Sequence, residues 1–254
     1  MNHKPWQSIF DTYNIYEHDF SKSPFILTAK QIKKATANFT RTTEREVRVL
    51  CKQDTRESRP QVFVNYDLFI LPIENGVYAI LQGEGYMDVP EITTQAVAYQ
   101  AKLDFELETS LVGDSEMQHL DFAYATSLIR SLLEDESLVL TIRGRKYTPT
   151  FEFYAGKHKQ LITVESVQTE VDAGYEGRNQ IVLIEAKNAK TRNVIIRQLY
   201  YPFRQWQVHT KKRVKLLFFE KRQNAYLFWE FGFTDEKDYN SIELLKSANF
   251  EIQR

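Results

Sequence analysis

The stretch SVQTEVDAGYEGRNQIVLIEAK, residues 166–187, decides how this chain is interpreted. Its two ends, residues 166–172 and 181–187, are rich in β-branched and aliphatic side chains, which is typical of strands. The residues between them include the turn-forming run Gly-Arg-Asn-Gln at positions 177–180. The sequence therefore predicts a β-hairpin with a four-residue loop.

The predicted hairpin fixes which side chains meet. Counting outward from a loop at residues 177–180 along both strands places Asp172 opposite Glu185. Side chains alternate along a strand, so Lys187 shares the face of Glu185 while Ala186 points the other way. Two carboxylates on rigid strands can hold a hard divalent cation such as Mg²⁺, and an adjacent ammonium can stabilise charge on a phosphate. This grouping favours metal-dependent phosphodiester hydrolysis.

The pattern Val171-Asp172, then Glu185-Ala186-Lys187, resembles the motif of the PD-(D/E)XK nuclease superfamily, with valine in place of the motif's proline. The longer stretches at residues 171–207 and 18–36 look like segments of type II restriction endonucleases. The resemblance implies that Asp172, Glu185 and Lys187 are catalytic. It also implies that both carboxylates bind Mg²⁺, with the backbone carbonyl of Ala186 as a further candidate ligand.

The same resemblance implies an α/β (α+β-like) fold, with a mixed central β-sheet flanked by helices. We expect an N-terminal α+β part at residues 1–112 that helps to recognise DNA, and a catalytic domain at residues 113–254. The implied activity is sequence-specific hydrolysis of double-stranded DNA, as in a type II restriction endonuclease. Cutting both strands favours a homodimer, and a restriction enzyme needs a cognate DNA methyltransferase as functional partner.

Hydrophobic periodicity predicts most of the remaining elements. In the N-terminal half we expect a helix at residues 29–39 capped by Thr28, and a hairpin at Asn75-Gly76. In the second half we expect the following elements: a long helix from Asp114 to about residue 135, strands near residues 138–142, 147–154 and 161–164, a helix at residues 193–206 that Pro202 kinks or divides, a strand pair around residues 220–224, and a last short helix after Ser241.

Basic residues are concentrated behind the motif. Residues 188–222 contain ten basic side chains and one acidic one, although the whole chain has a net charge of −1. Clustered positive charge favours contact with phosphates. The candidate DNA-binding residues are Lys211, Lys212 and Arg213 in a predicted loop, Arg143 and Arg145 at a predicted turn or hairpin tip, and Lys33 and Lys34 on the first predicted helix.

Each feature has a structural alternative. Asp172, Glu185 and Lys187 could form an ordinary cross-strand salt bridge, and runs of charge are usually solvated faces. Glu170 could assist metal binding from the face of Asp172 or be a surface acid, and Gln198 and Tyr201 could lie near the DNA backbone or belong to a helix that packs on the core. The superfamily's helix before the Asp strand often supplies a further acid, for which Glu116, Asp121 and Glu134 are candidates.

Composition and missing motifs exclude other classes. The chain of 254 residues is 43% hydrophobic and 26% charged, as in globular proteins, and no apolar run approaches the length of a membrane span. Cys51 is the single cysteine, and the first twenty residues lack a signal peptide's apolar core, so we expect a cytoplasmic protein and no contact with membranes. No zinc, P-loop, dinucleotide or serine-hydrolase motif is present.

Two other functions fit the same residues. One is a nuclease of the same fold that acts in repair, or on RNA, without sequence specificity. The other is a catalytically silent DNA-binding protein. The complete Asp, Glu and Lys set argues against the second.

Overall fold

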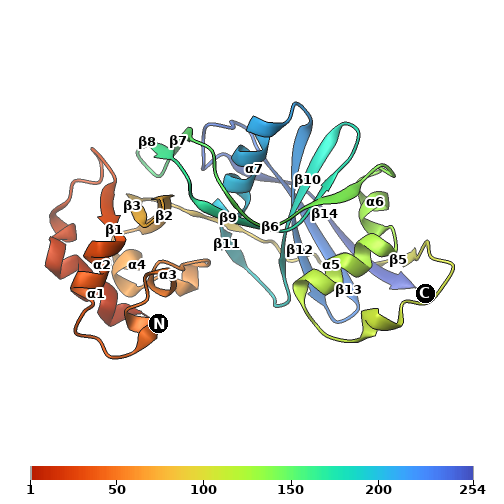
Figure 1. The fold of residues 1–254 in the computed structure, drawn as a ribbon, viewed down its shortest axis with the longest axis horizontal. Coiled ribbons are helices and arrows are strands. Elements are labelled where there is room, and N and C mark those ends of the chain that lie inside the picture. The colour runs from red at the N-terminus through yellow and green to blue at the C-terminus, as the bar shows by residue number, and fades with distance from the viewer. Residues whose placement is uncertain (1, 254) are drawn as a thin grey trace.

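A seven-stranded mixed sheet forms the centre of the protein in the computed structural model, which describes residues 2–253 (Figure 1). Its strands are, in spatial order, β5 (Val97–Gln100), β14 (Ile242–Gln253), β13 (Ala225–Phe233), β12 (Arg213–Arg222), β10 (Gln180–Lys187), β9 (Gln168–Glu176) and β6 (Val139–Tyr147). The pairs β10–β12 and β5–β14 are parallel, and the other neighbours are antiparallel. A mixed α/β architecture, as predicted, is confirmed.

Helices pack on both faces of this sheet. On one face α7 (Arg197–His209) contributes Leu199, Tyr200 and Phe203 to a core that includes Leu183 of β10. On the other face α5 (Glu116–Ala125) and α6 (Leu128–Leu132) pack against the intervening side chains of the same strands. Because β10 is buried from both sides, its run of aliphatic residues is nearly continuous.

A second unit precedes the large sheet and lies at the left of Figure 1. Its antiparallel sheet has the order β1-β3-β2, and an aromatic-rich core holds its helices against one face. The elements are α1 (His3–Tyr13), η1 (Ile15–Glu17), β1 (Phe25–Thr28), α2 (Ala29–Ala35), η2 (Thr42–Glu44), α3 (Val47–Leu50), η3 (Arg56–Ser58), α4 (Gln61–Asn65), β2 (Leu68–Glu74) and β3 (Val77–Gln82).

Two local predictions for this unit are confirmed. Thr28 caps α2 in a reciprocal capping box with Gln31, which satisfies backbone donors at the helix start. The β2–β3 hairpin turns at Asn75-Gly76, where Gly76 has a φ of +78°. Glycine tolerates this conformation without the steric penalty of a Cβ atom.

Two short ladders lie outside both sheets, and one of them packs against the first unit. The pair β4 (Tyr86–Asp88) and β11 (Asn193–Ile195) links the chain after β3 to the segment before α7. The hairpin of β7 (Phe151–Ala155) and β8 (Gln160–Val164) packs beside β2, and η4 (Glu108–Leu111) precedes α5. Phe69 of β2 stacks on Tyr239, with ring centroids 6.0 Å apart. One apolar core therefore extends from β2 to α7.

Three predicted elements differ in the structure. The predicted helix after Ser241 is wrong, because β14 pairs with β13 and β5 and the two ladders override the local helix propensity. The long helix predicted from Asp114 divides into α5 and α6 at Ser127, whose φ is +65°. The helix predicted to start at residue 193 begins after β11, and Pro202 lies inside an uninterrupted α7.

The division of the chain at residues 112 and 113 stays a prediction. The strand β5 lies before that boundary, yet it pairs with β14 at the edge of the large sheet. No helix among residues 2–253 has the length and apolarity needed to cross a bilayer.

Candidate active site

The predicted β9–β10 hairpin is present with the predicted register. Ile181 pairs with Glu176 and Ile184 pairs with Ala173. Gly177 closes the loop by donating its N–H to the carbonyl of Gln180 at 2.8 Å. The backbone ladder ends one pair before Asp172 and Glu185, so these two residues lie at the open end of the hairpin.

The Asp172 carboxylate continues the ladder in place of the backbone. Its Oδ2 accepts a hydrogen bond of 2.7 Å from the N–H of Ala186. The register of β9 against β6 shifts at the same point, since Ile142 pairs with Gly174 but Gly144 pairs with Val171. Two residues of β9 thus oppose one residue of β6, which is a β-bulge. The bulge re-aims Asp172 toward the end of β10.

The bulge also switches which side chains face α7. Thr169 and Val171 pack toward α7, whereas Ala173 and Tyr175 pack toward α5 and α6. The simple alternation that would put Glu170 on the face of Asp172 is therefore interrupted.

Glu185 and Lys187 form an ion pair at the end of β10. The Nζ atom of Lys187 lies 2.5 Å from Oε1 of Glu185 and donates a second hydrogen bond of 3.0 Å to the carbonyl of Ala186. Glu185 is only 9% exposed. The Lys187 ammonium therefore lies between the Glu185 carboxylate and the Ala186 carbonyl, which are two of the three groups predicted as metal ligands.

Burial dominates the electrostatics of these groups. It raises the pKa of Glu185 to about 7, against the opposing charge of Lys187, and it raises the pKa of Asp172 as well. Burial lowers the pKa of Lys187, but contact with Glu185 outweighs it and the net direction is upward. Each carboxylate is destabilised in its charged form and gains from a nearby cation.

A third carboxylate comes from α5. Oε1 of Glu116 accepts a hydrogen bond of 3.2 Å from the N–H of Asn188, directly after Lys187. Glu116 is also close enough to Asp172 to raise its pKa, after the larger effect of burial. Of the three acids that the sequence left open, Glu116 is therefore the one beside the site.

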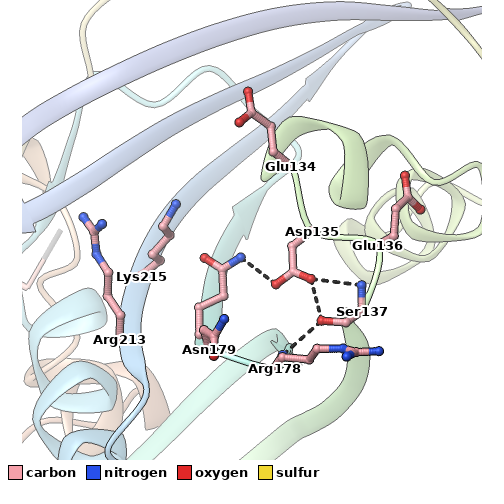
Figure 2. A pocket seen from close by; sticks show the side chains of 9 residues that line it. Glu134, Asp135, Glu136, Ser137, Arg178, Asn179, Arg213 and Lys215 are labelled. Atoms are coloured by element: carbon pink, nitrogen blue, oxygen red, sulfur yellow. Dashed lines mark hydrogen bonds between the residues drawn. The ribbon is translucent and has the colours of Figure 1, made fainter.

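The other two acids lie elsewhere. Asp121 forms an ion pair with Arg143. Glu134 lines a separate hollow at the β9–β10 turn, where Figure 2 shows it across from Arg213 and Lys215 of β12. The full strand β10 separates this hollow from Lys187, a length of about 23 Å at 3.3 Å per residue.

The donor set fits a divalent cation in charge and chemistry. Asp172, Glu185 and Glu116 supply three carboxyl groups beside the single ammonium of Lys187, and carboxylate oxygens are donors that Mg²⁺ prefers. Among residues 2–253, no three His, Cys, Asp or Glu side chains are already arranged as a metal-binding group. Asp172, Glu185 and the Ala186 carbonyl are the groups able to hold Mg²⁺, with Glu116 nearby, and Lys187 bridges Glu185 and the Ala186 carbonyl.

The accessory candidates border the same place. Glu170 and Gln198 line a narrow space beside Glu185, and Oε1 of Gln198 is buried without a hydrogen-bond partner within the described chain. Glu170 also approaches Arg145 on β6 at 3.4 Å. Tyr201 is fully buried and donates its hydroxyl to the carbonyl of Pro72, so it belongs to the core.

The predicted DNA-binding residues fall into three separate regions. Arg143 and Arg145 lie within β6 around Gly144, not at a hairpin tip, and they are one strand away from Asp172. Lys33 and Lys34 are exposed on α2 of the first unit. Lys211, Lys212 and Arg213 lie at the start of β12, beside Gln180, at the far end of β10 from the site.

Acids from elsewhere in the chain neutralise much of the basic stretch at residues 188–222. Glu91 binds Lys190 and Arg222, and Glu176 binds Lys212. Glu230 approaches Lys215 at 3.6 Å. The charge of the linear stretch therefore overstates the positive charge of the surface that it forms.

Two family models match consecutive parts of the chain. Residues 3–80 match the model described as domain of unknown function DUF6996, and residues 81–251 match domain of unknown function DUF6997. No curated protein and no solved structure matches the chain. The second family model covers more than half of the chain and includes every residue of the candidate site.

Proposed function

We propose that this chain, which belongs to the DUF6997 family, is a magnesium-dependent endodeoxyribonuclease of the PD-(D/E)XK type. The observation that carries the proposal is the cation-binding end of β10. There, the Lys187 ammonium lies between the carboxylate of Glu185 and the carbonyl of Ala186, and Asp172 binds the neighbouring N–H. An ordinary surface salt bridge would not require a buried glutamate whose pKa is raised to about 7.

The side chains of the site have distinct roles in this proposal. Asp172, Glu185 and the Ala186 carbonyl would hold Mg²⁺, which when bound neutralises phosphate charge and lowers the pKa of a coordinated water. Lys187 would leave its present position between two oxygens, orient the attacking water and stabilise negative charge on the phosphate. Glu116 would hold the strand end in place through Asn188.

The resemblance of residues 18–36 and 171–207 to type II restriction endonucleases supports a more specific form of the proposal. In that form the substrate is double-stranded DNA with a defined short sequence, and a homodimer cuts both strands. The protein would act in the cytoplasm beside a DNA methyltransferase that protects the cell's own DNA.

Incubation of the whole chain with long duplex DNA, in Mg²⁺ and in EDTA, tests the proposal. Discrete fragments that appear only with Mg²⁺ are expected. A smear, or degradation of RNA, would indicate a non-specific or repair nuclease of the same fold. DNA that is bound without Mg²⁺ and stays uncut would indicate a catalytically silent DNA-binding protein.

A further inference from the structure

Exposed basic side chains without acidic partners are concentrated on and beside α2, η2 and α3 in the first unit. Residues 28–50 contain six basic and two acidic side chains, a net charge of +4. All six basic side chains are exposed, and among residues 2–253 none of them forms an ion pair or a side-chain hydrogen bond. We call this set the α2–α3 basic surface: Lys30, Lys33, Lys34, Arg41, Arg45 and Arg48.

The helices that carry this surface are fixed relative to each other by α1. Ser8 donates its hydroxyl to the carbonyl of Ala35 at the end of α2. Trp6, which is fully buried, donates its indole N–H to the carbonyl of Leu50 at the end of α3, at 3.0 Å. The α2–α3 basic surface is therefore presented by rigid elements, as a specific binding surface requires.

Fold stability explains only part of this arrangement. Basic residues in a last helical turn complement the helix dipole, which accounts for Lys33, Lys34 and Arg48. However, Lys30 lies three and four residues before the other two lysines, and like charges at these spacings destabilise a helix. Neither effect requires Arg41 and Arg45. An anionic ligand would relieve this repulsion.

A short segment after α3 connects this surface to the neighbourhood of the candidate active site. Arg48 and Asp54 are six positions apart in the sequence, so their Cα atoms are at most about 22 Å apart. The carbonyl of Asp54 accepts from the N–H of Ile195, two residues before α7, and the Asp54 carboxylate lies 3.7 Å from Arg197. The next residue, Gln198, borders Glu185. These contacts link the segment that follows α3 to the candidate site.

We propose that the α2–α3 basic surface binds the phosphate backbone of the duplex that the active site cleaves, without reading its sequence and without needing Mg²⁺. The choice of duplex DNA as the ligand rests on the proposed function. Charge complementarity is the argument for a polyanion, and exposed, unpaired Lys and Arg side chains suit phosphates. The surface would anchor DNA while Asp172, Glu185 and Lys187 act on it.

Fluorescence anisotropy of a labelled duplex, titrated with the full chain in EDTA between about 50 and 200 mM NaCl, tests this. The test variant is Lys33→Ala/Lys34→Ala/Arg48→Ala. Its matched control is Lys22→Ala/Lys102→Ala/Lys246→Ala, which removes the same charge from exposed lysines that are each paired with an acid.

Three lost phosphate contacts should reduce the slope of log affinity against log salt by about 2.7, and should weaken binding roughly a hundredfold at about 0.1 M salt. The affinity of the test variant should fall equally for two duplexes of unrelated sequence, and the control variant should bind like wild type. Unchanged binding by the test variant, equal loss in the control, or no duplex binding by wild type would overturn the proposal. The proposal would also fail if the test variant bound the duplex like wild type but had lost binding to vesicles of equal parts phosphatidylcholine and phosphatidylserine.

Failure of the nuclease proposal gives a different result. EDTA prevents metal-dependent cleavage throughout the titration, so the binding measurement does not depend on catalysis. Wild-type protein that binds the duplex with the expected salt slope, but leaves it uncut in Mg²⁺, would refute the nuclease and retain the α2–α3 basic surface.

Discussion

Replacing Glu185 with glutamine should stabilise the metal-free protein at alkaline pH. Burial raises the pKa of Glu185 to about 7 from an ordinary value of 4.5. Between these two values the folded chain binds a proton that the unfolded chain has released, so stability falls as pH rises through this window. This pKa difference corresponds to a loss of about 3 kcal/mol in the free energy of unfolding when Glu185 ionises. A neutral glutamine does not ionise, so the variant would not show this loss.

Urea unfolding of wild type and Glu185→Gln at pH 5 and pH 8, in EDTA, measures this effect. The variant should gain up to about 3 kcal/mol on wild type between the two pH values. It keeps the Ala186 carbonyl as an acceptor for Lys187. Glu165→Gln, at an exposed glutamate, is the control and should show no such gain. A difference between Glu185→Gln and wild type that does not change with pH would refute the reasoning.

Three further predictions follow from individual contacts. Glu116→Gln should weaken Mg²⁺ binding about tenfold in a calorimetric titration, because it removes one of three clustered negative charges, whereas Glu134→Gln in the distant hollow should leave it unchanged. Thr28→Ala should cost about 1 kcal/mol in chemical unfolding through loss of the α2 cap, and Thr40→Ala, at an exposed site, should cost much less. Tyr175→Phe should leave stability unchanged or raise it by up to about 1 kcal/mol, since the buried Tyr175 hydroxyl has no hydrogen-bond partner within the described chain; a clear loss would contradict that.

Short-range features of the sequence were predictive. The loop at residues 177–180 fixed the β9–β10 register, because the alternation of a hairpin leaves no freedom once its loop is known. The same is true of the Asn75-Gly76 turn and the Thr28 cap, whose residue types directly satisfy a backbone requirement. The meeting of Glu185 and Lys187 followed from the same local geometry.

Features that depend on distant partners were not predictable. Residues 242–253 have the composition of a short helix, but β13 and β5 provide ladder partners on both sides. The bulge at Asp172 depends on β6, which is more than twenty residues away in sequence. The choice of Glu116 over Asp121 required the packing of α5 against β9 and β10.

The charge of residues 188–222 shows the same limit. Linear counting indicated a strongly basic surface behind the motif, but Glu91, Glu176 and Glu230 come from other parts of the sequence to pair with it. The less conspicuous run at residues 28–50 keeps its charge unpaired. Only the tertiary fold distinguishes a neutralised basic run from one available to a ligand.

Plasmid cleavage by wild type, Lys187→Met and Lys190→Met in Mg²⁺ tests the central claim most directly. Lys190 is a matched control, since it lies three residues further on and pairs with Glu91 at the surface. The account predicts Mg²⁺-dependent cleavage by wild type and Lys190→Met, and a loss of about a hundredfold to a thousandfold in Lys187→Met, as when a group that stabilises transition-state charge is removed. Equal cleavage by wild type and Lys187→Met, or no cleavage by any of the three proteins, would contradict it.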